Sequence, residues 1–192
     1  MIKHKDQRVG IFVDVQNMYH SAKNLYKANV NFAEILKVAV ADRRLVRAIA
    51  YVVQSKSFEE TAFFEALSKQ GFEIKMKDLQ IFWGGEKKAD WDVGLSVDAI
   101  KMAPNLDVIV LVSGDGDYIP LIEYLQYHGR IAEVVAFGGT TSSKLKEVAD
   151  DFVDLGQDQN RFLIHYPQNK IKARNKKINK INKNQPTNQL TN

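Results

Sequence analysis

Two short runs of almost unbroken apolar residues limit the possible folds of this chain more than any other feature. Residues 9–13 read Val-Gly-Ile-Phe-Val, and residues 107–112 read Asp-Val-Ile-Val-Leu-Val. Runs of this length and composition are typical of strands buried on both faces, as in a parallel sheet. Parallel strands need crossover connections, so helices should lie between them.

The remaining pattern alternates helices and strands. We expect helices after Asn17, over residues 32–40, 58–69, 90–102 and 142–150, and from Tyr118 to before Gly129. We expect further strands over residues 46–53, 72–76, 79–83 and 131–137, with an edge strand over 152–155. This order predicts a three-layer α/β fold with a mostly parallel central sheet and helices on both faces.

Composition excludes several classes of protein. The 192 residues, 45% of them apolar, suit one domain with a real core. There is no cysteine, which excludes disulfides and thiolate metal sites. The first residues lack the apolar segment of a signal peptide, and no apolar run approaches the roughly 18 residues of a membrane span. We therefore expect a cytoplasmic protein with no membrane partner.

The charge is divided unevenly along the chain. Residues 168–192 carry seven basic residues and no acid, so the remaining residues carry −3 of the total charge of +4. We place the folded domain in residues 1–166 and a basic, disordered tail in residues 167–192. Such a tail would add salt-dependent, sequence-blind RNA affinity, or would act only as a solubilising segment.

Polar and acidic residues follow both apolar runs directly. They are Asp14 and Asn17 after the first run, and Ser113, Asp115 and Asp117 after the second. Asp92 opens the helix that leads into the second run. Ligands of an open parallel sheet bind at the carboxyl ends of its strands, so these acids should converge on one edge.

Converging carboxylates favour a bound cation. Two unit charges about 4 Å apart repel by roughly 4 kcal/mol at an effective dielectric constant near 20. A divalent ion reverses this energy, and ligation by oxygen alone favours Mg²⁺ or Mn²⁺. We expect Asp14, Asp92 and Asp115 to be the metal ligands.

Each acid also has an ordinary structural interpretation. Asp117 is a suitable helix N-cap ahead of Pro120, Asp115 suits a tight turn, and Asp92 suits the cap of its own helix. Asp98 shares an apolar helical stripe, but six residues of helix separate it from Asp92 by about 9 Å. We expect Asp98 and Ser113 to act behind the ligands, with a buried structural Asp98 as the alternative.

Three ordered motifs resemble the NYN domain, and more narrowly its bacterial LabA-like branch. They are residues 12–17 (Phe-Val-Asp-Val-Gln-Asn), 88–99 (Lys-Ala-Asp-Trp-Asp-Val-Gly-Leu-Ser-Val-Asp-Ala) and 111–118 (Leu-Val-Ser-Gly-Asp-Gly-Asp-Tyr). The resemblance runs from about Val9 to Leu155. It implies a PIN-like nuclease fold and RNA cleavage that depends on Mg²⁺ or Mn²⁺.

The resemblance also assigns catalytic positions. Asp14, Asp92, Asp115 and Asp117 fall on the acidic positions of the family, and Asn17 falls on the Asn after the first strand. In this hypothesis Asp117 binds a second ion or orients the nucleophile. Asn17 fixes Asp14 or touches the scissile phosphate.

RNA contacts need cations near the acidic site. Lys87 and Lys88 precede Asp92 and are candidates for flanking phosphates, and Trp83 is a candidate for base stacking on single-stranded RNA. The alternatives are a solvated pair of lysines and a Trp83 that packs in the core. Ser142 lies at an expected helix start, which suits either a phosphate or a helix cap.

Other functions remain as alternatives. The same fold can form a catalytically silent RNA-binding module, or a regulator that acts through a protein partner or a homodimer. A phosphatase that uses Asp-x-Asp after the first strand is opposed by Asp14-Val15-Gln16. A dinucleotide-binding enzyme is opposed because the glycine-rich turn is missing at the same place.

Overall fold

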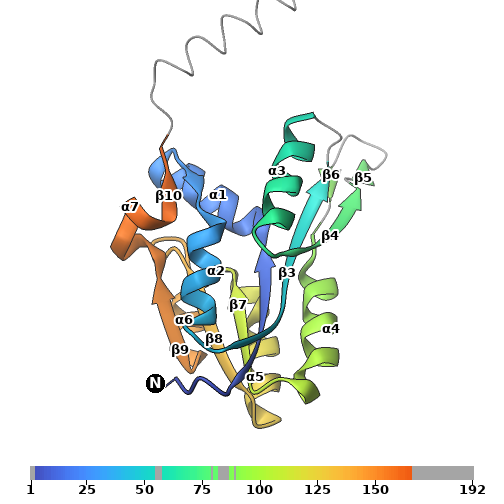
Figure 1. The fold of residues 1–192 in the computed structure, drawn as a ribbon, viewed down its shortest axis with the longest axis vertical. Coiled ribbons are helices and arrows are strands. Elements are labelled where there is room, and N and C mark those ends of the chain that lie inside the picture. The colour runs from blue at the N-terminus through green and yellow to red at the C-terminus, as the bar shows by residue number, and fades with distance from the viewer. Residues whose placement is uncertain (1–2, 55–57, 79, 82–86, 89, 166–192) are drawn as a thin grey trace, which may run out of the picture.

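The structure, a computed structural model, contains one six-stranded parallel sheet (Figure 1). It describes residues 3–54, 58–78, 80–81, 87–88 and 90–165. The strand order is β4-β3-β1-β7-β8-β9, and every neighbouring pair is parallel. These strands are β1 (Arg8–Asp14), β3 (Arg44–Gln54), β4 (Glu73–Asp78), β7 (Val108–Val112), β8 (Ile131–Ala136) and β9 (Asp151–Asp154).

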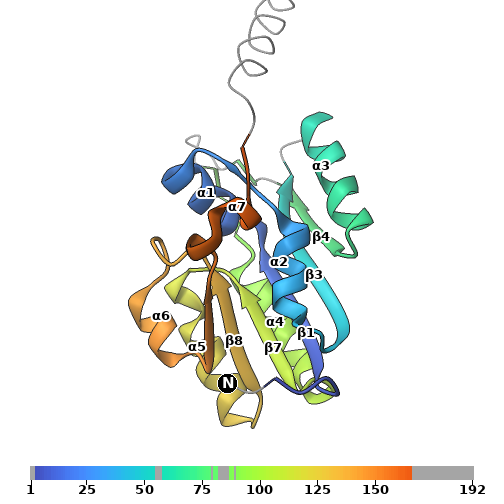
Figure 2. The same ribbon diagram turned by 60° about the vertical axis from the view of Figure 1, so that its left-hand side comes forward.

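Helices cover both faces of this sheet. They are α1 (Val15–Tyr26), α2 (Phe32–Val40), α3 (Phe58–Lys69), α4 (Asp92–Met102), α5 (Ile119–Tyr127), α6 (Ser143–Val148) and α7 (Gln159–Phe162). Figure 2 shows α2 and α7 in front of the sheet and α4 and α5 behind it. The expected three-layer α/β fold is confirmed. None of the helices in the described residues is long and apolar enough to cross a membrane.

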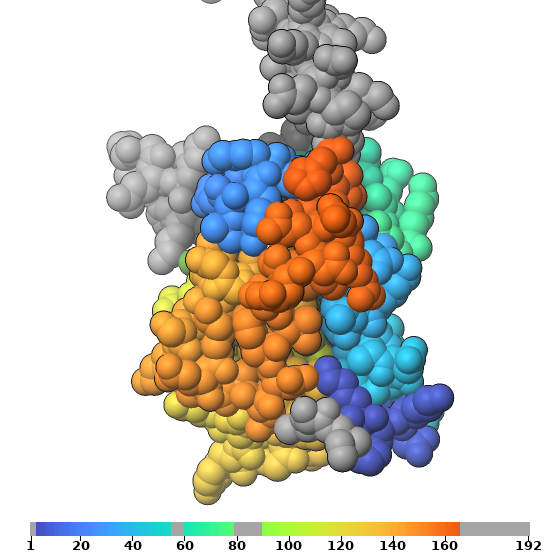
Figure 3. Space-filling model, turned by 90° about the vertical axis from the view of Figure 1, so that its left-hand side faces the viewer, coloured from blue at the N-terminus to red at the C-terminus, as the bar shows by residue number. Residues whose placement is uncertain are grey.

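Short antiparallel pairs complete the described chain. Strand β2 (Asn29–Val30) pairs with β10 (Leu163–Ile164), which brings the end of the described chain back against the region between α1 and α2. Figure 3 shows this orange C-terminal segment against the blue atoms of the N-terminal half. The second pair joins β5 (Gln80–Ile81) to β6 (Lys87–Lys88). These two-residue strands have no sequence pattern of their own, and only β5 overlaps an expected strand.

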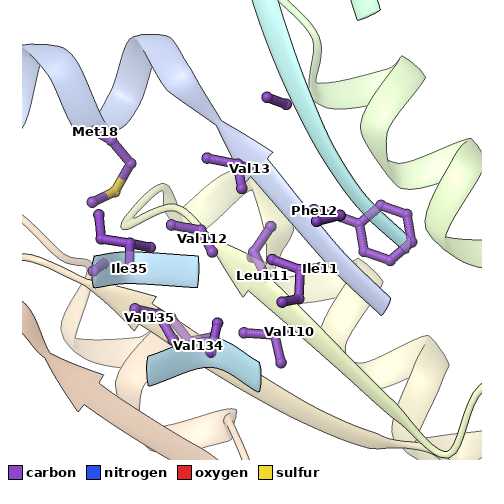
Figure 4. Close-up of a cluster of buried hydrophobic side chains, with 14 of the residues drawn as sticks. Ile11, Phe12, Val13, Met18, Ile35, Val110, Leu111, Val112, Val134 and Val135 are labelled. Carbon is purple, nitrogen blue, oxygen red and sulfur yellow. The ribbon is translucent and has the colours of Figure 1, made fainter. Parts of the chain in front are cut away.

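The two apolar runs form the centre of the core. Strands β1 and β7 are neighbours, with Ile11 beside Val110 and Val13 beside Val112. Their side chains are at most 1% exposed, because helices cover them from both faces (Figure 4). The adjacent register places the carboxyl ends of β1 and β7 next to each other, which fixes where the residues after them must lie.

A buried ion pair joins α2 to β8. Arg43 and Glu133 form two hydrogen bonds of 2.7 and 2.8 Å, and their side chains are 1% and 2% exposed. The guanidinium also donates to the backbone carbonyls of Ala39 and Val40, which lie at the end of α2. Because the pair is out of water, loss of Glu133 would leave the guanidinium buried without its carboxylate, whereas loss of Arg43 would leave Glu133 only its longer ion pair with Lys3, at 3.4 Å.

Candidate functional site

Asp14 is the last residue of β1 and the first residue of the candidate site. Its side chain is buried, and Oδ1 accepts a hydrogen bond of 3.0 Å from the backbone N–H of Asn17. Asp is a favoured N-cap, so this carboxylate ends the strand and starts α1. The helix therefore begins at Val15 and not after Asn17 as expected.

The loop after β7 is bonded to the start of α1. Asn17 Oδ1 accepts a hydrogen bond of 3.0 Å from the backbone N–H of Gly114. Ser113 is fully buried, and its Oγ donates to Asp14 Oδ2 at 3.5 Å while accepting from the N–H of Asp115 at 3.2 Å. The structure thus brings together Asp14, Asn17, Ser113 and Asp115 as the sequence predicted.

Asp92 joins this group through the hydroxyl of Tyr118. The hydroxyl donates to Asp92 Oδ1 at 3.0 Å and lies 3.4 Å from Asp14 Oδ2. Trp91 is the N-cap of α4 and makes no side-chain capping bond, and Asp92 is the first helical residue. Asp92 is therefore not the cap of its own helix. The Tyr118 hydroxyl lies between its carboxylate and that of Asp14.

Asp115 and Asp117 occupy a short turn after β7. Asp115 Oδ1 accepts from the N–H of Asp117 at 3.0 Å and caps the one-turn helix Gly116–Tyr118. The tight-turn interpretation of Asp115 is correct, although the residue also lines the cleft described below. Asp117 is exposed, and Tyr118 takes the N-cap position of α5, so Asp117 does not cap this helix.

Burial and like charges raise the proton affinity of the acids. Burial, with smaller contributions from the charges of Asp92 and Asp115, raises the pKa of Asp14 from 3.8 to about 6, against the bond from Asn17. Burial also raises the pKa of Asp92, helped by the other acids nearby. For the Tyr118 hydroxyl, burial and the charges of Asp14 and Asp92 raise the pKa. The protein therefore does not fully compensate the negative charge of Asp14 and Asp92.

These residues open into a cleft of about 350 Å³ at the carboxyl edge of the sheet. Its acidic lining consists of Asp14, Asp90, Asp92 and Asp115, and α1 contributes Gln16, Asn17, His20 and Asn24. The remaining lining residues include Trp91 and Thr140. The cleft is thus acidic where the strands end and formed by neutral polar side chains and an imidazole along α1.

The donor chemistry of the cleft suits a hard divalent cation. Its acids are oxygen donors, and burial together with neighbouring negative charge raises the pKa of Asp14 and of Asp92, an effect that a bound cation would reverse. Within the described ranges, no three His, Cys, Asp or Glu side chains are already arranged as a metal-binding group. Asp14 and Asp92 are linked by the Tyr118 hydroxyl, which lies within hydrogen-bonding distance of both carboxylates.

Asp98 lies outside this group. Its Oδ2 accepts from Tyr51 Oη at 2.8 Å and from Lys75 Nζ at 2.5 Å. Burial raises the pKa of Asp98, but these two bonds and the charge of Lys75 outweigh burial and lower it. Its partners on β3 and β4 support the structural interpretation of Asp98.

Of the residues expected to contact RNA, Ser142 adjoins the loop that carries Asp115, because its backbone N–H donates to the Gly114 carbonyl at 3.0 Å. Ser142 caps α6, accepting from the N–H of Leu145 at 3.4 Å. Lys87 and Lys88 form β6, but their side chains lie outside the described residues, as do Trp83 and the tail.

Several cleft residues escaped the sequence analysis. Tyr118 was expected only as a helical core residue; its ring is indeed buried, and only the hydroxyl reaches the acids. Its position directly after the Asp-Gly-Asp turn was the available signal. His20 and Asn24 lie one helical turn apart on α1, a spacing that predicts a shared face.

The fold and the cleft together define a class of protein: an α/β domain with an acidic site at the carboxyl ends of its central strands. Residues 8–156 match the NYN domain, and the chain belongs to this family. The NYN family is part of the PIN-like nuclease superfamily; its domains are generally nucleases that use divalent metals.

Individual relatives agree with this assignment. The chain is 27% identical over 162 residues to "Low amplitude and bright protein LabA" of Synechococcus elongatus, covering 79% of this chain and 85% of that protein. It is 25% identical to an uncharacterized protein of Methanocaldococcus jannaschii, covering 80% of this chain but 57% of that protein. A crystal structure of a protein of unknown function from Vibrio parahaemolyticus is similar, with a TM-score of 0.77 and 34% identity. It covers 85% of this chain and 100% of the Vibrio chain.

Proposed function

We propose that this protein is a ribonuclease that cuts single-stranded RNA with the help of Mg²⁺ or Mn²⁺. The observation that carries the proposal is the gathering of Asp14, Asp92 and Asp115 in one open cleft. Burial and neighbouring negative charge raise the pKa of Asp14 and of Asp92, so the protein alone stabilises these carboxylates poorly. Membership of a family of metal-dependent nucleases supports the same conclusion.

Asp14, Asp92 and Asp115 would hold the metal ion. When bound, the ion would lower the pKa of a water molecule and stabilise negative charge on the phosphate. Asp14 Oδ1 accepts a bond of 3.0 Å from the N–H of Asn17, whereas Oδ2 accepts only longer bonds of 3.5 and 3.4 Å from the hydroxyls of Ser113 and Tyr118, so Oδ2 is the oxygen that an ion would take more easily. Asp117 is exposed beside this group and is proposed to orient the attacking water or to hold a second ion.

Asn17 and Tyr118 position the acids. Asn17 bonds to Asp14 through its backbone N–H and to the loop after β7 through Oδ1, so it sets Asp14 and Asp115 in relation to each other. Tyr118, which is 1% exposed, donates a hydrogen bond from its hydroxyl to Asp92 Oδ1. Both residues therefore hold the carboxylates in place before any ion arrives, which reduces the ordering cost of binding.

The experiment is a cleavage assay on labelled single-stranded RNA with Mn²⁺, with Mg²⁺ and with EDTA. We expect cleavage in either metal, none in EDTA, and a loss of about 100-fold or more in Asp115→Asn, since the substitution removes a charge at the proposed metal site. Asp6→Asn is the matched control because Asp6 precedes β1, at the opposite end of that strand from Asp14. Equal activity of Asp115→Asn and wild type would refute the assignment.

A catalytically silent RNA-binding or regulatory module is the second candidate. It is favoured by one observation: the Tyr118 hydroxyl already bonds to Asp92 and lies within bonding distance of Asp14, where a cation would compete. This function predicts RNA binding that is unaffected by EDTA and no cleavage in either metal. The same assay, with binding measured in parallel, separates the two candidates.

A further inference from the structure

Two lysine–aromatic pairs flank the acidic cleft, one on each side. The first belongs to α1, where Lys23 Nζ lies 5.5 Å from the centre of the Tyr19 ring. The second joins β4 to the start of α4, where Lys77 Nζ lies 5.6 Å from the centre of the Trp91 ring. Neither lysine has a carboxylate partner in the described part of the chain.

The α1 pair adjoins the polar side of the cleft. Tyr19 and Lys23 are four residues apart, so they lie on the same face of the helix. Their neighbours His20 and Asn24 line the cleft. The Tyr19 side chain is 47% exposed and forms an edge contact with His20 at 5.6 Å between ring centres. A large aromatic ring thus stays in water beside the cleft, where it can be covered by a ligand.

The Trp91 pair is fixed on the acidic side. The indole N–H donates to the carbonyl of Val52 at 2.8 Å, and the ring meets Tyr51 edge-on with 5.3 Å between centres. Trp91 itself lines the cleft. Lys77 Nζ donates to the backbone carbonyl of Asp90 at 3.0 Å, which holds the charge at the mouth of the cleft.

An RNA strand that enters the acidic cleft needs lysine or arginine side chains nearby to bind its phosphates. Among the described lining residues there are four acids and no Lys or Arg. The lining offers hydrogen-bond donors from α1, such as Gln16, Asn24 and His20, but no fixed positive charge for the phosphates of an entering strand. Lys23, over the Tyr19 ring, and Lys77, bonded to the Asp90 carbonyl, place positive charge next to residues of this lining.

We propose that one strand of RNA crosses the cleft from Tyr19–Lys23 to Lys77–Trp91. Bases contact the two rings, flanking phosphates contact the two lysines, and the phosphate between them lies over Asp14, Asp92 and Asp115. Rings and lysines in alternation are the usual means of holding single strands without reading their sequence. The inference rests on the proposed function only in placing the scissile phosphate at the acids.

Binding measurements test the lysines without requiring catalysis. Full-length Asp115→Asn protein in EDTA is titrated into a fluorescein-labelled oligouridylate of about 12 nucleotides, at several salt concentrations. Adding Lys23→Gln and Lys77→Gln should reduce the slope of log K against log salt by about 1.4, since each single-strand phosphate contact contributes about 0.7. The matched control is Lys5→Gln with Lys69→Gln, which removes two exposed charges near the opposite end of the sheet.

The rings have their own tests. Tyr19→Leu should weaken binding at least about fivefold, the loss expected for one base–aromatic contact. Tyr127→Leu on α5 is the control, because Tyr127 is 88% exposed away from the cleft lining. Since Trp91 packs against Tyr51 and a substitution risks the fold, its contact is read by fluorescence. In a Trp83→Phe background Trp91 is the only tryptophan, and oligouridylate should quench its emission.

The outcomes separate this inference from the proposed catalysis. A salt slope that falls only in the Lys23/Lys77 variant, weaker binding by Tyr19→Leu and quenching of Trp91 support the path, even if wild type cleaves no RNA. An unchanged slope, or an equal decrease in the Lys5/Lys69 control, overturns the path even if metal-dependent cleavage is found. No binding of oligouridylate, or tighter binding of the matching oligothymidylate, also overturns it.

Discussion

Replacing Asp14 by Asn should stabilise the metal-free protein while removing its proposed activity. Asp14 has a pKa of about 6 in the folded chain against an ordinary value of 3.8, mainly because it is buried. A raised carboxyl pKa means that the folded state resists ionisation. The resulting loss of stability is absent below pH 3.8, grows as the pH rises, and is complete above about pH 6.

The size of the effect follows from the two pKa values. A difference of about two pH units corresponds to about 3 kcal/mol at pH 7.5 and to about 1.5 kcal/mol at pH 5. Asn retains a carbonyl oxygen that can accept from the N–H of Asn17, and Asn is as good an N-cap as Asp. Because the N-cap bond is kept, removal of the buried charge should stabilise the folded state by most of this amount.

Urea unfolding in EDTA measures this difference. Asp14→Asn should have a higher free energy of unfolding than wild type by up to about 3 kcal/mol at pH 7.5, falling by half at pH 5. Saturating Mn²⁺ should reduce the difference, because it stabilises only the wild-type carboxylate. A variant that is less stable than wild type at pH 7.5, or a difference that is independent of pH, would refute the reasoning. Asp6→Asn serves as the control for a general change in charge.

Two further predictions concern residues outside the cleft. Arg43→Ala should lower the free energy of unfolding by about 3–5 kcal/mol in urea titrations, because the buried Glu133 keeps only its longer ion pair with Lys3; a loss below 1 kcal/mol would contradict this. Asp98→Asn should lose about 1–3 kcal/mol of stability but retain a cleavage rate within about twofold of wild type, since Asp98 bonds to Tyr51 and Lys75 and to no acid of the cleft. A large fall in rate with normal stability would instead return Asp98 to the active site.

The central strands and their acids could be predicted because one rule governs both. A strand buried on both faces must be apolar throughout, so the end of β1 at Asp14 and of β7 before Ser113 is visible in the sequence. Parallel pairing then brings the ends together without further information. Helices such as α2 and α3 were expected with the bounds they have, because their apolar spacing was regular.

The rest of the site depends on contacts between distant segments. Tyr118 reaches Asp14 across 104 positions of the chain, and Lys77 on β4 reaches Trp91 at the start of α4. Local patterns describe Tyr118 correctly as a core residue, whereas Lys77 lies just beyond the strand expected over residues 72–76 and belongs to β4 in the structure. Only the packing of α4 against the sheet brings the Tyr118 hydroxyl to Asp92 and the Lys77 ammonium group to Trp91.

Strand β4 ends the six-stranded sheet, so one of its edges has no neighbour within that sheet. Along one face it presents Glu73, Lys75 and Lys77, and an open edge that carries charges pairs poorly with the edge of another molecule. We therefore expect the lysine proposed to hold RNA also to disfavour edge-to-edge pairing between copies of the protein. Replacing both lysines of β4 by valine would remove that protection, whereas glutamine at Lys77 alone leaves the edge polar.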